Sequence, residues 1–351
     1  MLVLVYFVLF FFCLIGLRSH KEYNIDYLAI DRCNSVKGFF IIIVFIRHIN
    51  QYILNSRYHF SNLGDLVYFK LDSLVGQFLV VMFLFFSGYG IMESYKKKGD
   101  SYVDTMPRKR VLTTLLNFDI AVLAFIIFNL LLGKSMSLKQ ILLSFLAWDS
   151  VGNSNWYIFC IILCYTLSFA VLYLYNKFFC LRNVYIYALL PIFFLSIVAM
   201  IVLSCFKAPY WYNTMLCFPF GMLYSEMKGR IERIVQLNYF GNLIILIVIL
   251  LILRYIPISL RGLVYNLEAL VFAMIVVLLM MRIELDNRWL QWMGQKLFPL
   301  YIYQRLSMMT IYELPGGKSF ISSYPLIYIM ICFICVLIIA SQYYRWQIKL
   351  S

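Results

Sequence analysis

The chain has 351 residues, of which 64% are hydrophobic and only 13% are charged, and its formal net charge is +14. A soluble domain carries about 25% charged residues, so this composition excludes an ordinary soluble protein and indicates an integral membrane protein. Lys and Arg gather at the cytoplasmic ends of membrane helices, so the basic excess requires no nucleic acid as a partner.

Apolar segments follow one another along the whole chain, most of them near the length of about 20 residues that a helix needs to cross a bilayer. We find eleven, at residues 2–17, 36–55, 73–94, 111–132, 156–176, 184–206, 211–225, 239–257, 262–281, 290–312 and 324–344. The weakest are 211–225, which is short, and 290–312, which contains several polar residues. The run 138–148 is too short to span and is expected to be an interfacial or re-entrant helix. We therefore predict an all-α polytopic membrane protein with about eleven transmembrane helices.

The first segment, 2–17, has no basic residue before its apolar run and no small-residue cleavage site after it, so it does not read as a cleaved signal peptide. The basic residues that follow it indicate an N-terminus outside the cell. If successive segments then cross the membrane in alternating directions, most of the 30 Lys and Arg residues lie on the cytoplasmic side, and the C-terminus is inside. We predict an extra N-terminal helix and loop at 1–25 and one membrane domain at 26–351, in a cell membrane.

The second segment contains a basic residue and a histidine eleven positions apart, Lys37 and His48. Eleven residues are three helical turns, so the two side chains fall on nearly the same face, about 16 Å apart along the axis. A histidine in hydrocarbon is costly unless it faces a cavity or a partner. His48 is therefore either a structural histidine bonded to a neighbouring helix or a general base that removes a proton from a substrate hydroxyl. Arg47 points about 100° away and is expected to serve a different neighbour.

Basic residues are concentrated at the cytoplasmic ends of the second to fourth segments. Lys37 either snorkels to the interface or binds an anionic cosubstrate. The loop 94–110 ends in Arg108, Lys109 and Arg110, which either mark the topology or form a phosphate-binding surface.

The third segment ends in Ser87 and Gly88 within an aromatic run. Small residues in an apolar helix usually allow close helix contact, and we favour this interpretation. Four further charged residues lie in other segments, where they either form ion pairs or line a cavity; these are Asp119, Glu268, Lys296 and Arg305.

The nine cysteines are not expected to bind a metal. Neither the Cys160/Cys164 pair nor the Cys332/Cys335 pair has a His or carboxylate ligand nearby in the sequence.

Together these motifs resemble the bacterial membrane acyltransferase family called acyltransferase-3, over about residues 26–345. The family begins with Arg-Gly and an apolar run that ends in His; here Lys37-Gly38 and His48 take these places with the same spacing. Further similarity is carried by the runs Phe83 to Tyr89, Pro107 to Arg110, Asn155 to Tyr157 and Met293 to Gln304. Two residues depart from the pattern. Lys37 keeps the charge of the usual arginine but loses its bidentate fork, and Gln304 or a neighbour stands where a second histidine is common.

The resemblance implies transfer of an acyl group, usually acetyl, to a hydroxyl of a glycan or lipid-linked sugar. The donor would be cytoplasmic acetyl-CoA, used as a substrate and not bound permanently. Under this hypothesis His48 is the base, Arg47 or Ser87 stabilises the oxyanion, and Lys37 with Arg108, Lys109 and Arg110 binds the anionic donor. The sequence does not identify the acceptor; a surface polysaccharide of a bacterium is expected. The alternative is a carrier or flippase for a lipid-linked sugar, which would have no acyl-ester product.

Overall fold

The protein is described by a computed structural model that covers residues 2–60, 62–178, 185–256 and 261–349. It is mostly helical, and seven of its described helices are long and apolar enough to cross a membrane, or eight if a bent pair counts as one span. This agrees with an all-α polytopic membrane protein, but the predicted count of about eleven spans is not confirmed.

The chain divides into two compact units, each built from separate stretches of sequence. The first unit comprises Met1–Leu79, Asn117–Asn155 and Arg282–Ile348, and the second comprises Val80–Leu116, Trp156–Met281 and Lys349–Ser351. These units do not divide the chain at residues 25 and 26, and the predicted division into 1–25 and 26–351 remains a prediction.

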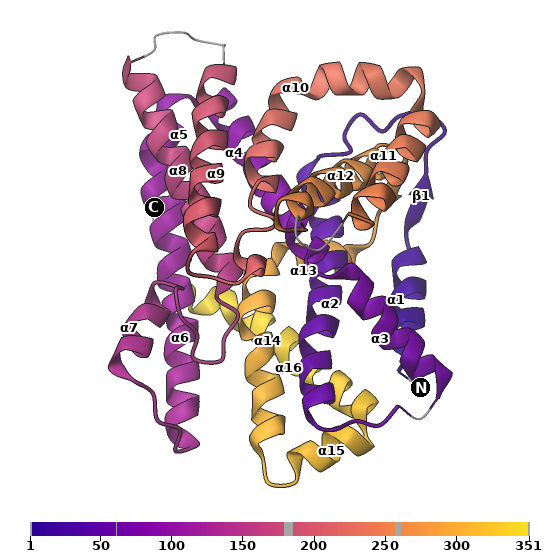
Figure 1. The fold of residues 1–351 in the computed structure, drawn as a ribbon, viewed down its shortest axis with the longest axis vertical. Helices are drawn as coiled ribbons and strands as arrows, with labels where there is room; N and C mark the ends of the chain where they lie inside the picture. The colour runs from indigo at the N-terminus through magenta and orange to yellow at the C-terminus, as the bar shows by residue number, and fades with distance from the viewer. Residues whose placement is uncertain (1, 61, 179–184, 257–260, 350–351) are drawn as a thin grey trace. The chain divides into compact units, whose positions relative to one another are not determined.

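The first unit holds the N-terminal and C-terminal helices. Its elements are α1 (Leu4–Leu14), β1 (Leu17–Ser19), α2 (Ile30–Asn55), α3 (Leu63–Val75), the later part of α6 (Thr113–Leu131), α7 (Leu138–Phe145), β2 (Ile283–Leu285), α13 (Arg288–Gln295), α14 (Leu297–Glu313), α15 (Gly317–Ser323), α16 (Pro325–Gln342) and the 3-10 turn Tyr343–Arg345. The helix α2 is buried over most of its length, because α13, α14 and α16 all pack against it (Figure 1).

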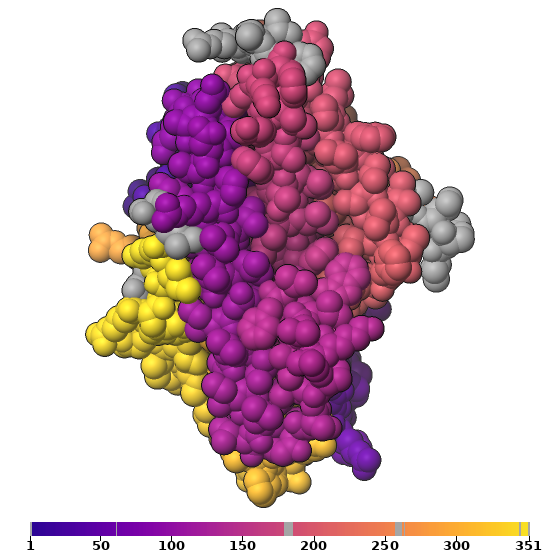
Figure 2. All heavy atoms as spheres, turned by 90° about the vertical axis from the view of Figure 1, so that its left-hand side faces the viewer, coloured from indigo at the N-terminus to yellow at the C-terminus, as the bar shows by residue number. Residues whose placement is uncertain are grey.

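The second unit holds the middle of the chain. Its elements are α4 (Phe78–Lys98), α5 (Asp100–Met106), the π-helix Pro107–Leu112, α8 (Trp156–Phe178), α9 (Ile186–Ser204), the 3-10 turn Pro209–Trp211, α10 (Cys217–Leu237), α11 (Tyr239–Arg254) and α12 (Arg261–Arg282). Figure 2 shows the side chains of α8 and α9 packed together on the face that it presents.

Several helix boundaries differ from the predicted segments. The predicted span 73–94 is divided at Gly76, whose φ of 51° ends α3 before α4 begins. The predicted span 290–312 is likewise divided, at Lys296, between α13 and α14. The predicted segments 211–225 and 239–257 correspond to α10 and α11, which meet at a bend of 104°. The short run 138–148 contains α7, which has only eight residues.

The first predicted span is a shorter helix than expected. Its helix α1 has 11 residues, and the chain then forms β1, which pairs antiparallel with β2 so that Leu17 faces Leu285. Polar contacts reinforce this ladder: His20 Nε2 lies 2.9 Å from Glu284 Oε2, Arg18 forms an ion pair with Asp286 at 3.0 Å, and Arg32 forms one with Glu284. The ladder ties the N-terminal segment to the connection between α12 and α13.

Candidate active site

The His48 side chain lies within the buried part of α2. It is 8% exposed, and its Nδ1 is enclosed without a hydrogen-bond partner among the residues that the structure describes. Buried polar side-chain atoms are bonded in the large majority of cases, so an unpaired ring nitrogen requires an explanation. A group that must exchange a proton with a substrate is one such explanation.

The helix α14 supplies the nearest polar neighbours of His48. The Tyr301 ring lies 6.2 Å from the imidazole, centroid to centroid. Gln304 is one turn further along α14, and its side chain interacts with the imidazole while its Nε2 donates to the Tyr301 carbonyl at 2.9 Å. Because α14 packs against α2, the two segments of the family pattern meet at His48.

Arg305 lies close enough to His48 to interact with it electrostatically, as does Arg47. Its Nη2 donates to Gln51 Oε1 at 2.7 Å, and its Nε donates to Ser154 Oγ at 2.9 Å. The guanidinium is thus held by α2 and by the loop before α8. Such a fixed donor can stabilise negative charge that develops beside the imidazole.

Arg47, which was predicted as a possible oxyanion donor, has a different partner. Its guanidinium pairs with the Asp72 carboxylate on α3 and donates to the Asp72 carbonyl at 3.3 Å. Next to it, the Tyr68 hydroxyl donates to Asn50 Oδ1 at 2.6 Å. Arg47 thus has its ion-pair partner on α3, while it also interacts electrostatically with His48, and this network joins α2 to α3.

Lys37 lies near the start of α2, where its Nζ donates to Asn34 at 3.4 Å. The glycine beside it has a definite packing role. A Cβ on Gly38 would lie 1.9 Å from the Leu290 carbonyl oxygen, and one on Gly294 would lie 1.9 Å from the Asn34 carbonyl oxygen. The glycines of two separate family motifs therefore let α2 and α13 approach each other with their backbones in contact.

Ser87 belongs to the second unit, on α4. Its hydroxyl donates to the Phe83 carbonyl at 2.7 Å and interacts with Tyr165 on α8. A Cβ on Gly88 would lie 1.9 Å from the Phe218 carbonyl oxygen, and one on Gly221 would lie 2.1 Å from the Phe85 carbonyl oxygen. The favoured interpretation of this motif, close helix contact, is confirmed for α4 and α10.

The basic run 108–110 also belongs to the second unit and forms half of the π-helix. Arg108 and Lys109 are exposed, whereas Arg110 is half-buried and interacts electrostatically with Tyr102 and Tyr165. Tyr165 thus links Arg110 to Ser87. Single π-helical turns are rare in proteins, but those that occur often lie at functional sites. This turn is therefore consistent with a binding role for the run.

The four charged residues of the membrane segments have unlike surroundings. Arg305 is part of the His48 site, and Glu268 pairs with Arg254 at 3.5 Å within the second unit.

In the described ranges, no group of three or more His, Cys, Asp or Glu side chains is placed to hold a metal ion.

The structure thus brings His48 and Arg305 together, and keeps Arg47 and Lys37 on the same helix. Sequence reasoning named Arg305 only as a charge in a membrane segment and did not single out Gln51, Ser154 or Tyr301. The available signal was the position of Arg305 directly after Gln304 in the last family motif.

The chain matches the model of the acyltransferase-3 family, described as an acyltransferase domain, over residues 30–341. The chain therefore belongs to this family of acyltransferases, whose members transfer acyl groups to sugars or lipids. No curated protein and no solved structure matches it. With its several apolar helices, the protein is a multi-pass membrane acyltransferase.

Proposed function

We propose that the protein transfers an acetyl group from cytoplasmic acetyl-CoA to a hydroxyl of a surface polysaccharide or of a lipid-linked sugar. The observation that carries this proposal is the buried His48 imidazole, whose Nδ1 has no protein partner in the described structure and which lies beside Arg305. Acyl transfer from a thioester to a hydroxyl needs a base for the hydroxyl proton and a cation for the oxyanion that forms. A buried imidazole near a fixed guanidinium can supply both.

In the proposed reaction, neutral His48 takes the proton of the acceptor hydroxyl as the oxygen attacks the thioester carbonyl. The carbon–sulfur bond then breaks, and the proton passes from the imidazolium to the departing thiolate. The products are an acetyl ester and free coenzyme A, and His48 returns to its neutral form. Positioned histidine bases contribute about 10²–10⁴-fold to the rates of such reactions.

Arg305 is the residue that we propose for stabilising the oxyanion of the tetrahedral intermediate. It is fixed by Gln51 and Ser154 and lies beside His48. Arg47 is less suited because Asp72 already neutralises it, and the Ser87 hydroxyl is already bonded to Phe83.

The donor is an anionic nucleotide, which favours binding by basic residues at the cytoplasmic ends of the helices. We propose this role for Lys37 in the first unit and, as a separate proposal for the second unit, for the exposed Arg108 and Lys109 and for Arg110 on the π-helix. The basic residues after the first segment support an N-terminus outside and a C-terminus inside, in the plasma membrane of a bacterium.

The experiment is a measurement of the O-acetyl content of surface glycan by proton NMR, in cells that lack the gene and in complemented cells. The complementing copies encode the wild type, His48→Ala, and His59→Ala as a control for an exposed histidine in a loop. We expect acetyl signals with the wild type and His59→Ala but not with His48→Ala, at matched membrane levels. Acetylation that does not depend on the gene would contradict the surface-glycan acceptor and favour the carrier or flippase.

A further inference from the structure

A large apolar cavity lies within the first unit, bounded by α1, α2, α13 and α16. Its volume is about 610 Å³, and all of its lining side chains are aliphatic, aromatic or thioether groups. Representative wall residues are Leu9, Phe12, Phe45, Met293, Ile329 and Phe333. No lining side chain carries a charge, and only Trp289 has a polar side-chain atom, so the cavity is poorly suited to the phosphates of a nucleotide or the several hydroxyls of a sugar.

Two walls of the cavity each follow a helix over about two turns. Its α1 wall runs from Leu4 to Phe12, about 12 Å, and its α16 wall runs from Leu326 to Phe333, about 10 Å. These walls suit an extended hydrocarbon chain.

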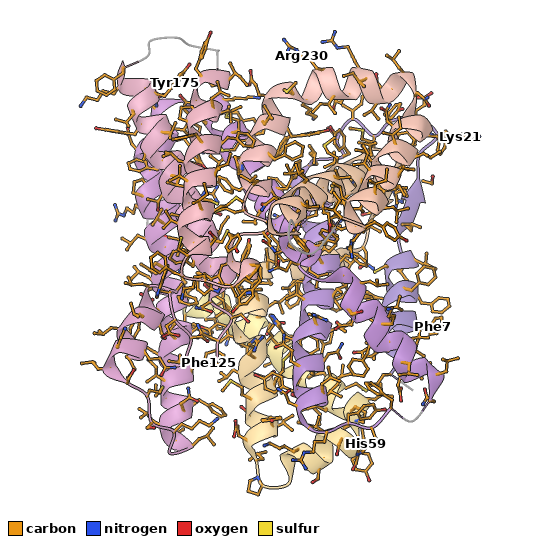
Figure 3. All side chains as sticks on the ribbon, viewed as in Figure 1. Phe7, Lys21, His59, Phe125, Tyr175 and Arg230 are labelled. Carbon is orange, nitrogen blue, oxygen red and sulfur yellow. The ribbon has the colours of Figure 1, made fainter. Side chains whose placement is uncertain are left out.

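The α1 wall is fixed at one end and faces hydrocarbon on its other side. Asn287 donates to the Phe12 carbonyl at 3.0 Å and also caps α13 by accepting from the Trp289 N–H at 2.9 Å. On the outer side of α1, Phe7 is 53% exposed (Figure 3) and Phe11 is 63% exposed. Leu4 and Val8, which line the cavity, are 50% and 68% exposed, so the cavity opens to the surface of this apolar helix and a hydrocarbon chain can enter it from the membrane.

The cavity leads toward His48. A second, narrow cavity of about 10 Å³ shares the walls formed by Ile42, Phe45, Met293 and Phe333, and its lining reaches Gln304. The Gln304 side chain in turn interacts with the His48 imidazole. The inner end of the large cavity is therefore separated from the proposed base by a few side chains.

We propose that this cavity binds the hydrocarbon chain of a lipid-linked sugar, and that such a glycolipid is the direct acyl acceptor. The inference rests on the proposed function, because it identifies the class of acceptor for the His48 site. Of the two proposed substrates, acetyl-CoA brings no long hydrocarbon chain, so only the acceptor can supply one. A chain held there confines the attached sugar to the neighbourhood of His48.

The first test is pulse labelling of native membranes with acetyl-CoA that carries radioactivity in its acetyl group. We expect early label in a glycolipid that is extractable into chloroform and methanol and is released by mild alkali, with label in polymer only later. Ile329→Trp fills the cavity and should lower the glycolipid label at least ~10-fold, the discrimination typical of a shape-selective apolar pocket. Ile331→Trp is the matched control, since Ile331 is on the same helix, is 39% exposed and does not line the cavity.

The second test measures occupancy without activity. The probe is dodecyl glucoside with a diazirine in its chain, bound to the purified protein in nanodiscs of phosphatidylcholine and crosslinked by light. We expect crosslinks at cavity residues in the wild type and Ile331→Trp, and their loss in Ile329→Trp.

Two kinds of result would overturn the inference, and a third would overturn the proposed function on which it rests. Alkali-labile label that enters polymer with no glycolipid precursor would show that the acceptor is not lipid-linked, while the acyltransferase function would stand. Crosslinking that is unchanged in Ile329→Trp would assign the cavity to ordinary membrane lipid. So would crosslinking that unlabelled dodecylphosphocholine competes away as well as unlabelled dodecyl glucoside does. If no acetyl enters any product, the proposed function itself fails, and the crosslinks still decide whether the cavity holds a hydrocarbon chain.

Discussion

The environment of His48 favours a chemical role over a structural one. A structural histidine in a membrane helix offsets the cost of its burial by bonding to its neighbours through its ring nitrogens. Here Nδ1 is buried without a partner in the described structure, while Arg305 places a cation beside the ring. The site thus combines a ring nitrogen without a protein partner in the described structure with a cation that interacts with the ring, and acyl transfer can use both.

Arg305 is predicted to be needed for catalysis through both of its hydrogen bonds. Arg305→Met should lower kcat/KM about 10²-fold or more, as the loss of an oxyanion donor does. Arg305→Lys should recover little of this, because an ammonium cannot reach Gln51 and Ser154 in the geometry of a guanidinium. The measurement is acetyl transfer in membrane vesicles, with the exposed Arg230→Met (Figure 3) as the control. Full activity of Arg305→Lys would refute this role.

Arg47 is predicted to act on stability and not on catalysis. Arg47→Met leaves the Asp72 carboxylate buried without its cation and should destabilise the protein by about 1–3 kcal/mol. The double variant Arg47→Met/Asp72→Leu removes both charges and should recover most of this stability together with acyl transfer. Thermal unfolding and transfer rates of the three proteins test this. A double variant that is stable but inactive would instead restore Arg47 to the catalytic site.

At the scale of elements, reciprocal glycines set the contact between α2 and α13. Gly38→Ala or Gly294→Ala places a methyl group against a backbone carbonyl. A backbone carbonyl cannot relieve the clash by changing rotamer, as a side chain could. Each should cost about 1–3 kcal/mol by overpacking and should displace the helix that carries His48. The helical glycines Gly90 and Gly229 have open space at the same position, so their alanine variants should be neutral or slightly stabilising. Thermal unfolding in detergent measures the difference; equal stability of all four would contradict the packing account.

Hydrophobic runs predicted most of these elements, because a helix in a membrane must be apolar over its whole length. The break at Gly76 was missed, since only the backbone conformation reveals that the chain turns there. The β1–β2 ladder was also missed, because strands of three residues leave no periodic pattern and their partners lie far apart in the sequence. For the same reason, the spacing from Lys37 to His48 was visible within one helix, but the contact between His48 and α14 depends on packing that no local pattern encodes.

At the scale of the whole molecule, the orientation of the termini separates an odd number of spans from an even one. The distribution of basic residues predicts an N-terminus outside and a C-terminus inside, which requires an odd number such as eleven. A C-terminal green fluorescent protein should therefore fluoresce, and a C-terminal alkaline phosphatase should be inactive. An active phosphatase at the C-terminus, with an N-terminal tag that is accessible from outside, would indicate an even number such as eight.

The measurement that tests the central claim most directly is acetyl transfer from radiolabelled acetyl-CoA to alkali-labile product in inverted membrane vesicles. Vesicles with the wild type, His48→Ala and His59→Ala are compared at equal protein levels and equal thermal stability. The account predicts that His59→Ala matches the wild type and that His48→Ala is slower by about 10²-fold or more. Transfer by His48→Ala at the wild-type rate would contradict the assignment of His48 as the base.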